Sequence, residues 1–542
     1  MRRTVLAIAL LAGTASAGTT QDLDRYQSYR QSAAVLAHYP DIPIDLESPG
    51  LAVGRDSFTS QQELEDFVAT LMRSSRHIVA GAIGESQQGR RIPYLIATAE
   101  GLSDDAAIRA LGRPIVWLIG LQHGNEPAGG EAMLAIASAL AHGELAALAD
   151  RITVVIVPRA NPDGAAAFRR TAANGADPNR DHLLMLLPET RMLHQLMGLL
   201  PPDVVLDTHE FTVANRWIAK FGALQAADAL LLSATHPMVS KQITRLADTV
   251  FRPRIEGALK AQGLSVFDYY TTSLDAGDKT VSMGGNAPGA ARNTFGLNNA
   301  VSFLIESRGV GIGREGFQRR VATHYLAAKA VLETAAEHAA ELHAVTQGAR
   351  GAVAAGAADI IVAHRLATRP VTLPLLDPAT GEPRPTPVTF RDSRAATPTM
   401  LRARPAGYLM LQAGVGAGAF AALRLNDITM CRVSEAADVE ADAFALKQRI
   451  PNVNPEAINP DQAVKVEVAR KSIRVPEGTA YVPAGQPAGL LAALALEPDS
   501  AGSLTGVGLV SAQDGTDELP VYRVYAPPRL AHVGLGDPAL CK

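Results

Sequence analysis

The chain has 542 residues, which is more than one hydrophobic core usually supports, so we expect two or three domains. Its hydrophobic content of 47% and charged content of 19% are those of an ordinary globular protein. The net charge of −4 gives no electrostatic reason to expect nucleic acid or an anionic membrane surface as a partner.

The N-terminus has the pattern of a secretory signal peptide. Arg2 and Arg3 precede an apolar run over 5–12, and the small residues 15–17 follow as a cleavage site. We therefore predict a signal peptide over 1–17. No later stretch reaches the roughly 20 apolar residues that a membrane span needs. The sequence predicts an exported protein, periplasmic or secreted, that is not inserted in a membrane.

A lead-in segment over 18–74 precedes a long region in which predicted strands and helices alternate. The predicted strands are a pair within 84–98 and single strands over 114–120, 152–157, 204–207 and 301–305. The predicted helices cover 127–140, 186–200, 237–262 and 317–342. This alternation predicts an α/β fold with a mixed, mainly parallel sheet flanked by helices, and we assign it to a catalytic domain over 75–345.

The composition and the hydrophobic pattern of the sequence change after about residue 350. Prolines crowd the stretch 370–405, and the apolar runs become short. We predict a β-rich C-terminal accessory region over 351–542, of one or two domains. Cys431 and Cys541 lie in this region and form either one disulfide or two free thiols, which the sequence does not decide.

Polar residues follow several predicted strands at their carboxyl ends, where open α/β sheets bind ligands. These residues are His123, Glu126, Asn161, Asp163, His209 and Glu306. His123 and Glu126 are three apart on one turn, and zinc accepts both imidazole nitrogen and carboxylate oxygen. The pair alone is a weak signal, because a solvated loop pair has the same spacing. A third ligand elsewhere in the chain is needed to make it a zinc site.

The order of these motifs resembles the zinc carboxypeptidases, of the pancreatic carboxypeptidase type. The matching segments are His123-x-x-Glu126, the Asn-Pro-Asp-Gly loop at 161–164, the arginine segment 168–171, the Asn-Arg-Asp run 179–181, His209 after an apolar strand, and Glu306 after the last strand. The resemblance covers about 75–340. Only 82 residues lie between Glu126 and His209, fewer than in the pancreatic enzymes. This difference indicates other loops around the cleft or a divergent bacterial, exported member.

The resemblance implies one zinc ion per catalytic domain, held by His123, Glu126 and His209, with one position left for water. It implies that Glu306 is the general base. It also implies an arginine that stabilises the oxyanion, which we assign to Arg169, with Arg170 as the alternative if the match slips by one residue. Asp207 is positioned to orient a ligand histidine.

For the substrate, the resemblance implies that Asn179 and Arg180 bind a free C-terminal carboxylate. Arg292 lies where the family builds its side-chain pocket. It is either a contact for an acidic substrate group or a loop arginine paired internally. The family's substrate-side tyrosine is expected near 281–291, which holds no Tyr, and the nearest candidates are Tyr269 and Tyr270.

We therefore predict an exported zinc metallocarboxypeptidase that acts on peptides with a free C-terminal carboxylate. A peptidoglycan stem-peptide hydrolase and an N-acyl amino acid amidase are alternatives on the same fold. A catalytically inactive exported binding protein is an alternative of another class. The presence of Glu306 argues against the last, because a protein without turnover has no need of a general base.

Overall fold

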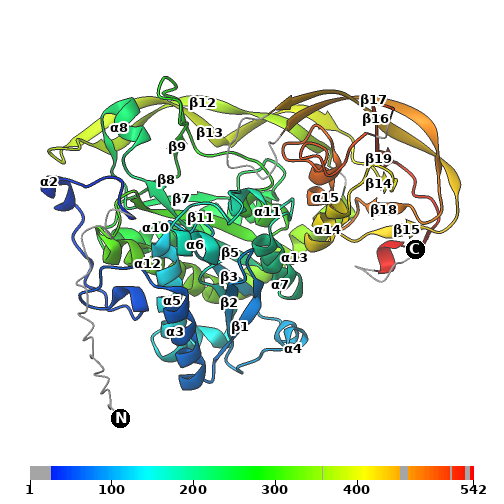
Figure 1. The fold of residues 1–542 in the computed structure, drawn as a ribbon. Coiled ribbons are helices and arrows are strands. Elements are labelled where there is room, and N and C mark those ends of the chain that lie inside the picture. The colour runs from blue at the N-terminus through cyan, green and yellow to red at the C-terminus, as the bar shows by residue number, and fades with distance from the viewer. Residues whose placement is uncertain (1–25, 357, 452–461, 513–514, 532–537, 542) are drawn as a thin grey trace, which may run out of the picture.

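The computed structural model describes residues 26–356, 358–451, 462–512, 515–531 and 538–541. The predicted signal peptide over 1–17 lies outside these residues. Figure 1 shows a sheet with helices on both faces, and a second, β-rich lobe formed by the C-terminal part of the chain. Among the described residues, no helix is long and apolar enough to cross a membrane.

The central sheet has eight strands in the order β1-β2-β4-β3-β5-β11-β7-β8. Its strands are β1 Ile78–Glu85, β2 Arg91–Ala97, β3 Ile115–Ile119, β4 Thr153–Val157, β5 Val204–Thr212, β7 Ala229–Ser233, β8 Val266–Asp268 and β11 Val301–Val310. The four central strands, β4, β3, β5 and β11, run parallel. Strands β1, β2 and β7 pair antiparallel with their inner neighbours. This is the mixed, mainly parallel sheet that the sequence predicted.

The apolar strand β3 shows why the sheet is covered on both faces. Val116 and Leu118 belong to the core cluster under α5 (Pro127–His142) and α12 (Phe317–Glu337). Trp117, which alternates with them, packs in the opposite cluster with α7 (Pro188–Leu199). All five side chains of β3 are buried, as expected for a parallel strand between two helical layers.

The helices divide between the two faces of the sheet. On the α5–α12 face lie also α3 Gln61–Ser74, α9 Lys241–Leu246 and α10 Arg252–Ala261, and on the α7 face lie α4 Asp105–Ala110 and α11 Ala291–Leu297. The start of α3 is a capping box, in which Ser60 Oγ accepts from the Glu63 amide and Glu63 accepts from the Ser60 amide. The other α-helices described before the C-terminal region are α2 Ala33–Leu36, α6 Pro162–Ala167, α8 Arg216–Phe221 and α13 Ala339–Ala355.

Several elements differ from the sequence prediction. The helix predicted over 237–262 is divided by a π-helical segment, Ala247–Phe251, and the helix predicted over 317–342 breaks at His338 between α12 and α13. Strands β5 and β11 run on through the polar residues that we expected just after them. Strand β7 was not predicted. Its run of four apolar residues is too short to distinguish a buried strand from the helix that follows.

The C-terminal part of the chain is β-rich, as the sequence predicted. A long hairpin, β12 Ile360–Leu376 with β13 Pro383–Arg402, forms a sheet with β6 Leu224–Gln225, β10 Val281–Ser282 and β9 Thr271–Thr272. A seven-stranded sheet follows, in the order β17-β16-β19-β14-β18-β15-β20. Its strands are β14 Gly407–Met410, β15 Cys431–Val433, β16 Ala437–Pro451, β17 Gln462–Val475, β18 Ala480–Pro483, β19 Glu518–Val524 and β20 Leu530–Ala531.

This region packs against the central sheet's helical layer. Helices α14 Ala417–Leu425 and α15 Gly489–Leu496 contribute Leu423 and Leu491 to the hydrophobic cluster that also contains Val116. Cys431 and Cys541 form a disulfide, which decides the alternative that the sequence left open. The hairpin β12–β13 therefore connects two lobes that share one core, and strands β9 and β10 bring it beside the pocket described below.

Candidate metal centre and pocket

The first two candidate ligands lie on the turn between β3 and α5. Glu126 precedes the first helical residue, Pro127, so the turn ends as helix α5 begins. The turn packs tightly on the Asn-Pro-Asp-Gly segment, because a Cβ on Gly124 would lie 1.9 Å from the backbone carbon of Gly164. Position 124 therefore requires glycine, and position 164 also does, because a Cβ there would lie 2.4 Å from Nδ2 of Asn161 and 2.8 Å from the backbone oxygen of Thr171.

The third candidate ligand, His209, lies within β5 and not after it. In the parallel pair of β5 and β11, His209 is the direct neighbour of Glu306. The two strands run in the same direction, so residues 97 positions apart in sequence become adjacent at one edge of the site. Strand pairing, which sequence spacing does not reveal, thus brings the expected base beside the expected ligand.

His123, Glu126 and His209 form a buried group whose donor atoms lie close together. Nδ1 of His209 is 3.0 Å from Nδ1 of His123 and 2.9 Å from Oε2 of Glu126. Nδ1 of His123 is 2.9 Å from Oε1 of Glu126. Ligands of a tetrahedral zinc ion stand roughly 3.4 Å apart, so the three atoms need only a small expansion to accept the ion.

Both candidate histidine ligands are oriented by a buried carboxylate. Nε2 of His123 donates to Asp177 at 3.0 Å, and Nε2 of His209 donates to Asp207 at 2.8 Å. These bonds leave both Nδ1 atoms facing the candidate metal position. A carboxylate behind each imidazole is the usual outer support of a zinc ligand. The role expected of Asp207 fits this geometry, whereas Asp177 was missed.

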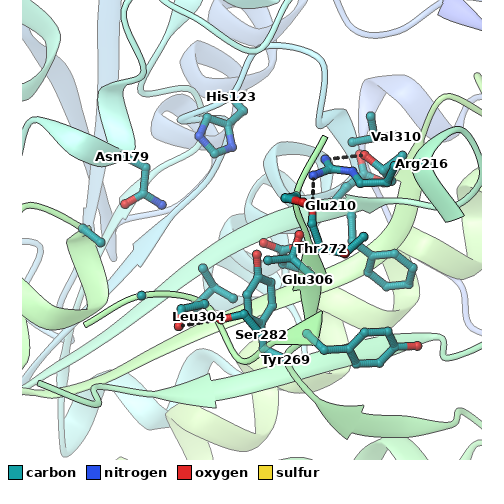
Figure 2. A pocket seen from close by; sticks show the side chains of 18 of the residues that line it. His123, Asn179, Glu210, Arg216, Tyr269, Thr272, Ser282, Leu304, Glu306 and Val310 are labelled. Atoms are coloured by element: carbon teal, nitrogen blue, oxygen red, sulfur yellow. Dashed lines mark hydrogen bonds between the residues drawn. The ribbon is translucent and has the colours of Figure 1, made fainter. Parts of the chain in front are cut away.

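A pocket of about 530 Å³ opens beside the metal group. It is lined by His123, Glu126, Arg170, Asn179, Arg180, Tyr269, Arg292 and Glu306, among others. Figure 2 shows that Glu306 and Tyr269 face the same part of this pocket, with His123 and Asn179 on the opposite wall. The structure therefore brings all but one of the residues predicted for the site into one place.

Glu306 is 8% exposed and has no ion-pair partner among the described residues. Burial and, to a lesser extent, the nearby charge of Glu126 raise the pKa of its carboxyl to about 7, against the opposing effect of His209 and Arg170. A carboxylate with a pKa near neutrality is suited to accept and return a proton.

The exception is Arg169. It does not line the pocket, and its Nη2 donates to the backbone oxygen of Ala172 at 2.8 Å. Arg170 lines the pocket instead, with Nη1 3.4 Å from Glu126 and Nη2 2.7 Å from Asp177. Of the two arginines that the sequence left open, Arg170 is therefore the one that lies at the pocket. Phe168 adopts a left-handed backbone conformation, with φ 46°, that turns the chain just before the two arginines.

Asn179 and Arg180 occupy different surroundings. Asn179 is buried, its Nδ2 lies 3.3 Å from Asp207, and its Oδ1 accepts from the Ala291 amide at 2.8 Å. Asn179 therefore links helix α11 to Asp207, the carboxylate that orients His209. Arg180 is exposed and reaches the pocket with its side chain. Tyr269 and Tyr270 both line the pocket, and the hydroxyl of the buried Tyr270 has no hydrogen-bond partner in the described chain.

The chain is similar to known proteins over most of its length. The zinc carboxypeptidase family model matches residues 64–192. A probable carboxypeptidase 2 of Trichophyton verrucosum is 30% identical over 403 residues, which are 71% of this chain and 77% of that protein. The chain belongs to the zinc carboxypeptidase family. Carboxypeptidase 2 of Trichophyton rubrum is 29% identical over 493 residues, 88% of each chain.

Among solved structures, carboxypeptidase A from Helicoverpa armigera is 16% identical, with a TM-score of 0.40 over 52% of this chain and 74% of that one. Membership of the zinc carboxypeptidase family makes this chain a metallocarboxypeptidase enzyme that acts on peptide substrates. The family depends on zinc, and the buried His-Glu-His group fits a metal ion.

Sequence reasoning missed two further residues of this zinc carboxypeptidase site. Gln122 donates to Asp207 at 2.7 Å and accepts from Nε2 of His182 at 2.7 Å. Asp177 supports His123. A rule was available for Asp177, because each ligand histidine requires an acceptor behind its second nitrogen and only Asp207 had been assigned. No comparable signal marks Gln122, whose neighbours come from segments far apart in the sequence.

Proposed function

We propose that this enzyme removes the C-terminal residue of peptides by hydrolysis of the last amide bond. The observation that carries the proposal is that the buried His123–Glu126–His209 group, Glu306 and two arginines, Arg170 and Arg180, open on one pocket. A bound zinc ion would be held by His123, Glu126 and His209 and would polarise the scissile carbonyl and acidify water.

Glu306 acts as the general base. It accepts the proton of the attacking water and returns it to the leaving amine, so the carboxylate is regenerated in each cycle. Its position beside His209 in the β5–β11 pair supports this role, because the carboxylate borders the ligand group and forms no competing ion pair with any described residue.

Arg170 stabilises the developing oxyanion. Its guanidinium borders both His123 and Glu126, and Asp177 holds it in that place. A fixed cation where negative charge develops is worth about 3 kcal/mol of the barrier. Arg180, which is exposed at the pocket, binds the substrate's terminal carboxylate, and Asn179 holds the wall beside it.

The test is mass spectrometry of a mixed peptide pool after incubation with the zinc-loaded enzyme, with a chelated sample as the control. We expect loss of single C-terminal residues that stops with the chelator. Intact peptides in the presence of bound zinc would contradict the proposal. In that case cell-wall stem peptides and N-acyl amino acids are the next substrates to test.

We also propose that the chain is exported and divided as predicted, with a signal peptide over 1–17, a catalytic domain over 75–345 and an accessory region over 351–542. N-terminal sequencing of the mature protein from the cells that express it should begin at Gly18. A mature protein that still begins at Met1 would contradict the export proposal.

A further inference from the structure

Arg292 is a buried cation whose charge faces the pocket. It lies on helix α11, is 6% exposed and is one of the lining residues. Its Nη2 donates to the Gly285 backbone oxygen at 2.6 Å and lies 3.4 Å from the hydroxyl of Thr235. Its Nε has no partner, and no carboxylate in the described part of the chain forms an ion pair with it.

Two other arginines near the site, the partly exposed Arg170 and the buried Arg320, each pair with a carboxylate. Arg170 contacts Asp177, and Arg320 contacts Glu210, each at 2.7 Å. Arg308 also has no carboxylate partner among the residues that the structure describes, but it stacks 3.8 Å over the ring of Tyr39 and does not line the pocket. Because a buried charge without a counter-ion is costly, Arg292 is the residue at this pocket that most needs an anion.

Gly284 packs closely against Tyr269 and Arg292 in the lining of the pocket. A Cβ at Gly284 would lie 3.0 Å from the ring of Tyr269 and 3.5 Å from Nη2 of Arg292. The same glycine has φ 81°, a conformation that other residues rarely adopt. A larger residue at this position would crowd both the tyrosine ring and the guanidinium.

Hydrogen bonds also connect the start of the helix that carries Arg292 to the candidate metal centre. The amide of the preceding residue, Ala291, donates to Asn179, which contacts the support of His209. Burial lowers the pKa of Arg292 only to about 10, so the side chain is cationic at neutral pH. The pocket that borders the metal group thus has a second positive charge in its lining, which the roles proposed for Glu306, Arg170 and Arg180 do not use.

We propose that Arg292 binds the side-chain carboxylate of the substrate's C-terminal residue, so that the enzyme prefers peptides ending in Glu or Asp. This inference rests on the proposed carboxypeptidase function. In this proposal the two arginines bind different groups of the substrate. Arg180 binds the terminal carboxylate, which every peptide has, and Arg292 binds the second carboxylate, which only acidic residues have.

The test compares kcat/KM for three N-blocked dipeptides that end in Glu, Gln and Leu, with the full zinc-loaded chain. Glu and Gln have nearly the same shape, so their ratio isolates the charge. We expect the wild type to favour Glu over Gln by about a hundredfold. In Arg292→Gln this preference should vanish through loss of Glu cleavage, while the Gln and Leu substrates change little.

Two further variants sharpen the comparison. Arg292→Lys keeps a positive charge and should retain part of the preference for Glu. Arg180→Gln should slow all three substrates together, because each carries a terminal carboxylate. Continued cleavage of the Leu substrate by Arg292→Gln shows, in the same sample, that this variant is folded.

Equal cleavage of the Glu and Gln substrates by the wild type would overturn this inference and leave the proposed carboxypeptidase function unaffected. An equal loss of all three substrates in Arg292→Gln would also overturn it and would assign Arg292 to the terminal carboxylate. Cleavage of none of the three by the wild type would overturn the proposed function and this inference with it.

Discussion

Gln122 and Asp207 form a 2.7 Å hydrogen bond in which the amide of Gln122 donates to the carboxylate that orients His209. The other end of the amide, Oε1, accepts from Nε2 of His182, and Nδ1 of His182 lies 2.9 Å from Nε2 of His194. The candidate metal ligand is thus supported through a buried chain of side chains that begins on helix α7.

We expect Gln122→Met to weaken zinc binding by about 10- to 100-fold, because Asp207 loses a donor and the orientation of His209 is less well defined. A competition titration against a chromophoric chelator measures this change. Gln62→Met, at an exposed position of α3, is the control. Equal zinc affinities for the two variants would show that Gln122 has no supporting role.

Glu306→Gln should keep zinc and lose turnover. The amide has the shape of the carboxylate but accepts no proton, so we expect kcat to fall by at least about 10²-fold. Zinc content by elemental analysis and peptide cleavage are measured on the same preparation. Glu341→Gln, exposed on α13, should behave as the wild type. A Glu306→Gln enzyme with normal kcat would remove this residue from the mechanism.

Alanine substitutions of the two adjacent arginines should have very different effects on kcat. We expect Arg170→Ala to lower kcat by about 10²- to 10³-fold, because the developing oxyanion loses its cation. Arg169→Ala removes one hydrogen bond to the Ala172 backbone and should leave kcat within a few-fold of the wild type. Steady-state kinetics of both variants on one peptide substrate measure the two losses of kcat. A larger loss in Arg169→Ala than in Arg170→Ala would support the assignment of the oxyanion role to Arg169.

The buried histidine pair should make the fold sensitive to acid. Burial lowers the pKa of His182 to about 4 and that of His194 well below its usual value. Above pH ~6.5 both groups are neutral in the folded and unfolded chains, so they have no effect. Below it the unfolded chain binds protons first, and the free energy of unfolding falls until the pH reaches about 4 for His182.

His194→Gln removes one titrating group and keeps a donor toward His182. We expect its free energy of unfolding to fall less steeply than that of the wild type between pH ~6.5 and ~4. Urea denaturation of metal-free protein at several pH values measures the slopes. His343→Gln, at an exposed position, should keep the slope of the wild type. Parallel curves for His194→Gln and the wild type would contradict the expectation.

Local sequence patterns were sufficient to predict much of this fold and of the candidate site. Continuous apolar runs marked β3 and β4, because strands covered on both faces need apolar side chains throughout. The ordered motifs around His123, Glu126, His209 and Glu306 marked the residues of the candidate ligand group and the candidate base. Each of these signals lies within a few consecutive residues, where backbone geometry and side-chain chemistry act directly.

Other features depend on which segments meet in space, and only the tertiary structure decided them. The turn after Phe168 selects Arg170 over Arg169 for the pocket, and a one-residue shift is below what a motif match resolves. The His209–Glu306 contact arises from the parallel pairing of β5 and β11, and Gln122 meets His182 through the packing of separate loops. Such contacts follow from long-range packing, which sums many small energies over the whole chain and leaves no local trace in the sequence.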